Sequence, residues 1–242
     1  ERALGAPVFI RGPNGLHLTT LGERLLPMVE QIQRGVCAVE DAVATDKVKV
    51  RLAVPSGFTT LITQHLPRLQ RDAPDVSLEL ISGSKPVNLK KGEAELALRL
   101  GPITDEDLVA QNMGEVGWSL YVAEAYLARR GAPADPRELC GHEIIGYAES
   151  LASVPGAKWL EAHGAGATVA LRSREMTDMV AAATAGLGLA VLPCVLGEMA
   201  NGLKRLTEEV LGTRRVSLVY RREMLRTPPA RAVINFVATV MR

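Results

Sequence analysis

From Val48 onward, apolar and polar positions alternate in short runs, and segments with helical spacing separate these runs. Residues 48–54 read VKVRLAV, the period of a half-buried strand, and five apolar residues then recur at helical spacing: Phe58, Leu61, Ile62, Leu66 and Leu69. The same criteria predict strands at 76–81, 95–100, 117–123, 142–148, 167–173, 187–193 and 215–221, and helices at 86–94, 124–131, 175–186 and 228–242. Alternating strands and helices favour an α/β fold with a mainly parallel sheet, built here from two consecutive units.

The segment before Val48 has a different pattern. A capping residue at Thr19 or Thr20, followed by Glu23, predicts the start of a long helix. Apolar residues then recur at alternating steps of four and three: Leu25, Val29, Ile32, Val36, Val39 and Val43. This narrow seam, held over about three heptads, favours pairing with a copy of the same helix in a second subunit. The alternative is an amphipathic helix packed on its own domain, which would bury a wider stripe.

Two junctions between a strand and a helix are candidate binding elements. Residues 55–59 follow the first strand, and residues 175–178 follow the strand that ends near Ser173. Each junction offers hydroxyls and free backbone N–H groups at a helix start, an arrangement that suits an anion such as a carboxylate. In the alternative interpretation Ser56 and Thr177 only cap their helices. A crevice between two α/β lobes would bring the carboxyl ends of strands to face such helix starts.

Composition and charge exclude several classes. The chain of 242 residues is long enough for one large or two small domains, and its 28 Lys and Arg nearly balance its 27 Asp and Glu, so no strong field points to a partner. No apolar run is long enough to span a bilayer, so no membrane partner is expected. The cysteines, Cys37, Cys140 and Cys194, are expected to be reduced core thiols in a cytoplasmic protein and not a metal site. Because the chain begins with Glu1, we expect that an upstream part is missing.

The candidate catalytic motifs in the sequence are all incomplete. The SGSK sequence at 82–85 lacks the companion motifs of a serine hydrolase, His142-Glu143 lacks a second histidine, and the glycines of GLGLA at 186–190 precede a strand instead of following one. The sequence therefore predicts a protein that is not an enzyme and that needs no cofactor.

Three regions of the sequence, the second made of two segments, resemble the LysR-type transcriptional regulators. In LGAPVFIRGPNGLHLTTLGERLLP, the positions in step with the end of the family's DNA-binding region are Leu4-Gly5, Val8-Phe9, Arg11, Gly15, Leu18-Thr19 and Gly22. The segments LPRLQRDAPDVSLEL and KKGEAELALR resemble the first unit of the family's effector domain, and AAATAGLGLAVLP resembles its second lobe. The resemblance covers the whole chain, and the segments that carry it occur in the family's order and spacing.

The resemblance implies an α/β chain with a long N-terminal linker helix, a two-lobed effector domain like type 2 periplasmic binding proteins, and the remnant of a winged helix-turn-helix. Residues 1–18 would be the end of the recognition helix and the wing, and residues 19–46 the dimerisation helix. Residues 47–120 and 219–242 would form lobe I, and residues 121–218 lobe II. Arg11, Asn14 and Thr19 would lie at the DNA, and Leu25, Val29, Ile32, Val36 and Val39 in the dimer.

The same resemblance implies effector-binding positions between the lobes: Ser56, Gly57, Phe58, Thr59, Ser82, Ser84, Arg99, Leu100, Gly101, Tyr147, Ala148, Met176 and Thr177. Which of Ser82 and Ser84 faces the cleft stays open. We therefore expect a cytoplasmic regulator that binds promoter DNA as a homodimer or dimer of dimers and senses a small anionic effector. RNA polymerase is a further candidate partner. The competing class is a transporter's solute-binding protein with the same fold, which would have no use for the long seam; an enzyme ranks third.

Overall fold

The computed structural model describes the chain except residues 2–3, 13–14, 44–46, 84 and 242, and it does not describe the side chains of residues 30 and 33–43 within the first helix. The chain divides into two compact units, residues 1–47 and 48–242, and each is considered by itself.

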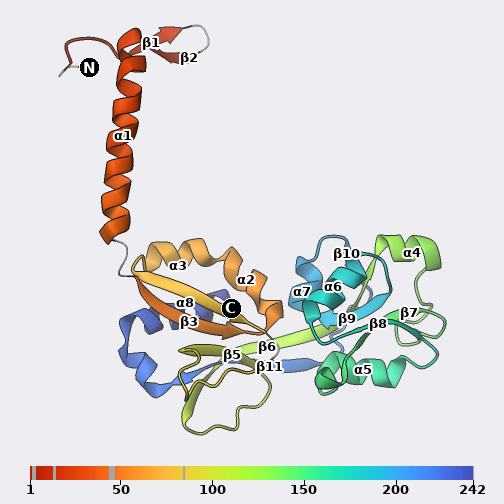
Figure 1. Cartoon of the computed structure of the whole chain (residues 1–242). Coiled ribbons are helices and arrows are strands. Elements are labelled where there is room, and N and C mark those ends of the chain that lie inside the picture. The colour runs from red at the N-terminus through yellow and green to blue at the C-terminus, as the bar shows by residue number, and fades with distance from the viewer. Residues whose placement is uncertain (2–3, 13–14, 44–46, 84, 242) are drawn as a thin grey trace. The chain divides into compact units, whose positions relative to one another are not determined.

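The first unit is a β-hairpin followed by one long helix (Figure 1). Strands β1 (Phe9–Gly12) and β2 (Gly15–Leu18) pair antiparallel, and α1 runs over Thr20–Val43. The Thr19 hydroxyl accepts a hydrogen bond from the Gly22 backbone N–H at 3.1 Å, so Thr19, and not Thr20, is the N-cap of α1. A Cβ on Gly22 would lie 2.4 Å from the Val8 carbonyl oxygen, so only glycine lets the helix start this close to the preceding chain.

The second unit is built on a nine-stranded mixed sheet in the order β4-β3-β5-β11-β6-β9-β7-β8, with β10 paired to β6 (Figure 1). The strands are β3 (Val48–Val54), β4 (Val76–Ser82), β5 (Leu96–Leu100), β6 (Leu108–Ala123), β7 (Glu143–Tyr147), β8 (Thr168–Ser173), β9 (Leu189–Pro193), β10 (Leu203–Arg205) and β11 (Thr213–Arg221). Parallel pairs join β3 to β4 and β5, and β7 to β8 and β9, whereas every pair made by β6 and β11 is antiparallel.

Helices cover both ends of this sheet. They are the short helix η2 (Ser56–Phe58), α2 (Thr59–Gln64), α3 (Leu66–Asp72), α4 (Glu124–Arg130), η3 (Glu149–Leu151), α5 (Pro155–His163), α6 (Met176–Thr184), α7 (Cys194–Met199), η4 (Arg222–Arg226) and α8 (Pro228–Val240). Helix α8 packs with α3 on β3 and β4, while α5, α6 and α7 pack on β9. The apolar residues that alternate in the sequence fill the space between these layers: Leu52, Leu96, Leu120, Val191 and Leu218 are fully buried.

Strands β6 and β11 run through both lobes and connect them. Strand β6 pairs with β11 over Leu108–Gly117 and then with β9 over Trp118–Tyr121, and β11 pairs with β5 only from Val216 onward. The register between β6 and β11 shifts around Arg215, which marks the irregularity where one lobe gives way to the other. The pairings with second-lobe strands thus begin before residue 121, the lobe boundary predicted from the sequence, and that boundary stays a prediction.

The helix predicted at residues 86–94 is wrong. This segment forms turns, in which the Glu93 carboxylate accepts a hydrogen bond from the Asn88 backbone N–H at 2.7 Å. Gly92 has φ +72°, a conformation that ends a helical run. Leu89 and Ala94 are nonetheless buried, since this loop covers one face of the first-lobe sheet. The apolar spacing that predicted a helix therefore reflects the packing of a loop.

Two further differences concern the sheet. Strand β6 begins at Leu108, nine residues before the predicted strand at 117–123, and α5 and α7 were not predicted. The sheet is also less parallel than expected, because β6 and β11 enter it antiparallel between the parallel sets. Of the helices in the described parts of the chain, none is both long and apolar enough to cross a membrane.

Candidate functional site

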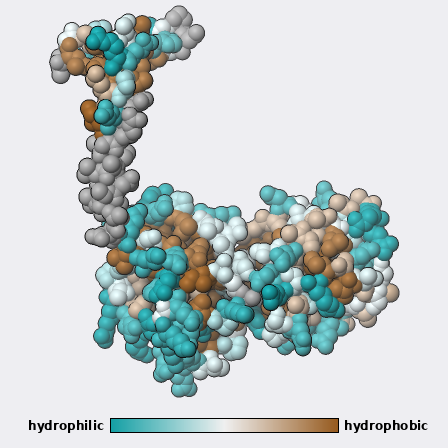
Figure 2. Space-filling model, in the orientation of Figure 1, coloured by the Kyte–Doolittle hydropathy of each residue, from teal (hydrophilic) through white to brown (hydrophobic). Residues whose placement is uncertain are grey.

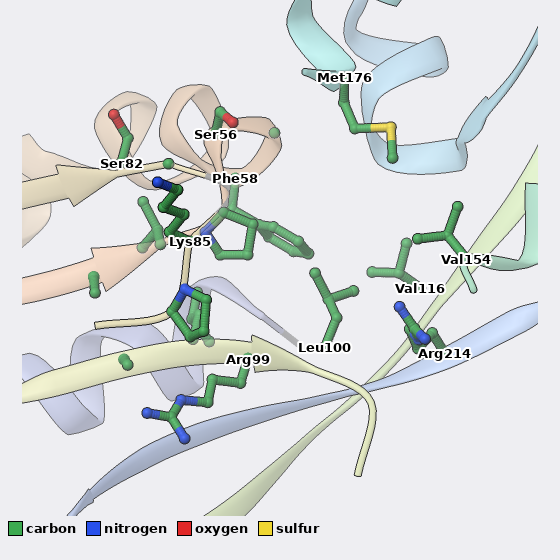
Figure 3. A pocket seen from close by; sticks show the side chains of 18 of the residues that line it. Ser56, Phe58, Ser82, Lys85, Arg99, Leu100, Val116, Val154, Met176 and Arg214 are labelled. Carbon is green, nitrogen blue, oxygen red and sulfur yellow. The ribbon is translucent and has the colours of Figure 1, made fainter. Parts of the chain in front are cut away.

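A cavity of about 450 Å³ lies between the two lobes of the second unit (Figure 3). The first lobe contributes the carboxyl ends of β3, β4 and β5 together with η2, and the second lobe contributes the start of α6, the start of α7 and the turn before α5. This volume is within the range of small-ligand sites, and the position, beyond the carboxyl ends of parallel strands, is where α/β sheets bind ligands.

Seven of the residues predicted for the effector line this cavity: Ser56, Gly57, Phe58, Ser82, Arg99, Leu100 and Met176. Five others do not line it: Thr59, Gly101, Tyr147, Ala148 and Thr177. Ser82 is exposed at the end of β4. Ser84 lies outside the described residues, so which of the two serines faces the cleft stays open.

The predicted residues that miss the cavity lie in other surroundings. Tyr147 is buried at the end of β7, where its hydroxyl donates a hydrogen bond to the Val191 carbonyl, and burial raises the pKa of this phenol. Thr177 is exposed on α6, and the Thr59 hydroxyl is buried without a partner among the described residues. Gly101 (φ +95°) packs against the side chain of Arg214, since a Cβ there would lie 3.4 Å from Nε.

One hydrogen bond crosses the cleft. The Ser56 hydroxyl, on η2 of the first lobe, donates to a carboxylate oxygen of Glu175, at the start of α6 in the second lobe, with 2.6 Å between the oxygens. Beside it Gly57 is buried, and a Cβ at that position would lie 2.8 Å from Leu196 on α7. The lobes therefore meet closely at η2, and the predicted anion cradle at Ser56 already holds a carboxylate.

Arg99 lines the cleft through its backbone and stem, but its guanidinium lies on the other side of β5 (Figure 3). There Nη2 donates to the Val87 carbonyl at 3.0 Å, beside a second hollow of about 310 Å³ that also contains Lys90 and Asp105. The Lys90 ammonium, 2.9 Å from Asp105, holds the pKa of that carboxyl below its usual value. The guanidinium of Arg99 is therefore not directed into the cleft, where the sequence predicted that it would contact the effector.

Sequence reasoning missed several lining residues. The charged residues among them include Lys85, Arg174, Glu175 and Arg214. The apolar residues among them include Val116, Trp118, Val154, Val195 and Leu196. Glu175 had a signal, because it belongs to the junction 175–178 that the sequence marks as a candidate binding element, although it was not among the predicted effector positions. Arg214 had none, because in the sequence it is one of two arginines before a strand.

The residues that line the cavity are better suited to binding a ligand than to catalysing a reaction. The cavity's apolar wall includes Phe58, Trp118 and Val154, all buried, and the lining residues contain neither histidine nor cysteine. Within the described part of the chain, no group of three or more His, Cys, Asp or Glu side chains could hold a metal ion. Such a surface can enclose an apolar ligand and orient it through a few charged groups.

In the first unit, Arg11 is exposed on β1 opposite Leu16, and Asn14 lies outside the described residues. Of the predicted dimerisation positions, Leu25 is half-buried and Val29 and Ile32 are exposed, at 55% and 67%, whereas the side chains of Val36 and Val39 are not described. Exposed apolar surface also appears on the hairpin (Figure 2). Met28, 60% exposed, lies on the same helix face as Leu25 and widens the predicted seam.

The fold and the cleft define a two-lobed regulatory domain of the type 2 periplasmic-binding-protein kind. Residues 45–242 match the family model of the LysR substrate binding domain, and the chain therefore belongs to the LysR-type transcriptional regulators.

Relatives and solved structures agree. The chain is 27% identical to the HTH-type transcriptional regulator YhjC of Escherichia coli (strain K12), over 93% of the chain and 81% of YhjC. It is 28% identical to CrgA of Neisseria meningitidis serogroup C (strain 8013), over 62% of the chain and 52% of CrgA. The structure of CrgA from Neisseria meningitidis has a TM-score of 0.70 and 19% sequence identity, and the match covers 99% of this chain and 85% of the CrgA chain. The full-length structure of AphB from Vibrio cholerae has a TM-score of 0.61 and 21% sequence identity, and the match covers 98% of this chain and 85% of the AphB chain. These two likenesses show the fold. Both relatives are described as HTH-type transcriptional regulators.

Proposed function

We propose that this regulator binds promoter DNA through a winged helix-turn-helix, of which residues 1–18 are the end, and senses a small anionic effector in the cleft between its lobes. It does so as a homodimer or dimer of dimers joined through α1. The observation that carries the proposal is the 450 Å³ cavity, which draws its wall from both lobes and is crossed by the Ser56–Glu175 hydrogen bond. A ligand that contacts both lobes binds their closed arrangement more tightly than an open one, and that difference in affinity is what a regulator needs.

The DNA-binding half of the proposal is tested with the complete gene product. Fragments of the source genome are selected on the immobilised protein, and the enriched sequence is footprinted. Arg11→Ala is expected to weaken binding to all DNA sequences alike and to reduce the salt dependence, because a phosphate contact carries no base information. Arg24→Ala, an exposed arginine on α1, serves as the control. Failure to enrich any sequence would refute the proposal.

The sensing half is tested by hydrogen exchange on the 242-residue chain with candidate small acids. A ligand in the cleft protects the backbone amides of η2 and of the start of α6 together, because these two segments contact one another across it. Protection confined to one lobe would place the ligand elsewhere.

A further inference from the structure

The guanidinium of Arg214 lies at the point where β11 passes from one lobe to the other. Arg214 pairs with Val116 of β6, and both line the cavity. Figure 3 shows its guanidinium below Val116 and across from Leu100. The Arg214 side chain packs beside Gly101, since a Cβ built at Gly101 would lie in ordinary van der Waals contact with Nε and Cζ, at 3.4 and 3.7 Å.

This guanidinium is half-buried, and its hydrogen bonds are weak. Its Nη2 donates to the carbonyl and hydroxyl oxygens of Ser153 at 3.3 and 3.4 Å, both near the limit for a hydrogen bond. No carboxylate of the described residues forms an ion pair with it. A partly buried charge without a counter-charge is costly, and an anion bound at the fork of the guanidinium would remove that cost.

Apart from Asp105, which is paired with Lys90, the other charged residues that line the cavity favour the same position. Glu175 lies at the Ser56 end, where it would repel an anion and already occupies the Ser56 hydroxyl. Lys85 and Arg174 are exposed, so water screens them, and the guanidinium of Arg99 points away behind β5. Between the two ends lies an apolar wall that includes Phe58, buried at the start of the first-lobe helices.

We infer that the effector is an amphipathic monoanion, whose single acidic group binds Arg214 and whose apolar body lies along the Phe58 and Val116 wall. This inference rests on the proposed effector cleft and specifies its ligand. It moves the anion away from the helix starts at Ser56 and Thr177 and assigns the specificity for charge to Arg214.

The test measures binding of phenylacetate and hexanoate, and of their neutral amides, to the 242-residue chain by calorimetry. The wild type is expected to prefer each acid over its amide by about tenfold or more, because hydrogen bonds to charged groups are the stronger ones. In Arg214→Gln this preference is expected to fall below about twofold, and in Arg214→Lys to be intermediate, because the charge remains but the fork is lost. The matched control is Arg174→Gln, which removes an exposed cation from the same cavity and is expected to keep the wild-type preference.

The outcomes separate the two proposals. Circular dichroism and melting temperature verify that each variant folds. If Arg214→Gln does not fold, Arg214→Lys still tests the role of Arg214. An acid preference that survives in both Arg214 variants, or that disappears in Arg174→Gln, refutes the anchor and leaves the effector cleft intact. Equal binding of acids and amides to the wild type, with η2 and α6 protected, refutes the monoanion while retaining the cleft. If neither acids nor amides bind, the ligand class is wrong, and DNA selection still decides the regulatory function.

Discussion

At the scale of single residues, the cleft is held by an interaction between two side chains 119 positions apart, Ser56 and Glu175. The hydroxyl donates to a charged acceptor at 2.6 Å, a short and strong type of hydrogen bond. It connects η2 to the start of α6, so it favours the arrangement in which the lobes are together. An effector that enters the cavity must therefore either preserve this bond or replace it.

Removing the Ser56 hydroxyl is expected to lower stability modestly. Ser56→Ala leaves Glu175 without this donor, at a cost of about 1 kcal/mol, or about 2–4 °C in melting temperature for a domain of this size. Thermal unfolding followed by circular dichroism measures the change. Thr63→Ala is the control, because its hydroxyl donates only to the Thr60 carbonyl within α2. Equal changes in both variants would show that the bond between the lobes contributes nothing.

The site was predictable from the sequence only where local patterns point to it. Ser56, Phe58 and Met176 follow strands and begin helices, and all three line the cleft. Thr177 satisfied the same local rule, and Tyr147 was predicted from the family resemblance, but neither lines the cleft. Both lines of reasoning locate a position along the chain and not the direction of its side chain. Arg214 was not predictable, since its environment is created by tertiary contacts with Gly101 and Ser153.

At the scale of elements, the pairing of β3 with β5 carries a pH-dependent contact. Burial raises the pKa of the Glu95 carboxyl, but hydrogen bonds from the Arg51 guanidinium and backbone N–H outweigh this, and the net shift is downward. A carboxyl whose pKa is lower in the folded state stabilises the fold above its unfolded pKa, about 4.3 for Glu. This contribution is lost as the pH falls through the lower, folded pKa.

Glu95→Gln is therefore expected to melt at a lower temperature than the wild type at pH 7, and the difference is expected to shrink as the pH falls below about 4.3. Melting curves between pH 7 and pH 3.5 test this. Glu79→Gln, whose pair with Lys49 is largely exposed, is expected to show little difference at any pH. A Glu95→Gln difference that stays constant with pH would exclude the charge as its source.

Helix α1 carries the prediction about assembly. Val29 and Ile32 are exposed within the first unit, and a seam of this kind is stabilised by burial against a second helix. Val29→Asp with Ile32→Asp is expected to convert the dimer to a monomer in sedimentation velocity, because the charges would be desolvated at the centre of the contact. Gln31→Asp adds a charge at an exposed neighbouring position and is expected to keep the dimer. A wild-type mass in the double variant would contradict pairing through this face.

Most elements of the fold were predictable because their patterns are regular. The strands at 48–54, 142–148 and 187–193 and the helix at 228–242 occur close to the predicted positions. The exceptions have physical causes. The loop at 86–94 mimics a helix because it buries Leu89 and Ala94 under the sheet, and the first half of β6 is half-exposed, so its apolar alternation is weak.

At the scale of the whole molecule, two strands connect the lobes, and the cavity lies where they pass from one lobe to the other. Any change in the angle between the lobes must therefore be taken up in β6 and β11. Gly114 (φ +99°) and the register shift near Arg215 are the positions where this ladder is already irregular. Because Arg214 adjoins that irregularity, a ligand bound to it acts directly on the segment that a lobe motion would deform.

Coupling between the cleft and the DNA must then be reciprocal. If a carboxylate bound at Arg214 changes the affinity of the complete gene product for its operator by some factor, the operator must change the affinity for the carboxylate by the same factor. We expect a factor of about 5- to 150-fold, the usual range for such coupling. Fluorescence anisotropy with labelled operator gives one ratio, and calorimetry with and without unlabelled operator gives the other. In Arg214→Gln both ratios are expected to approach one, whereas Arg174→Gln should retain them. Two unequal ratios in the wild type would mean that the carboxylate acts on the DNA complex at a second site, since a single cleft site obliges them to agree.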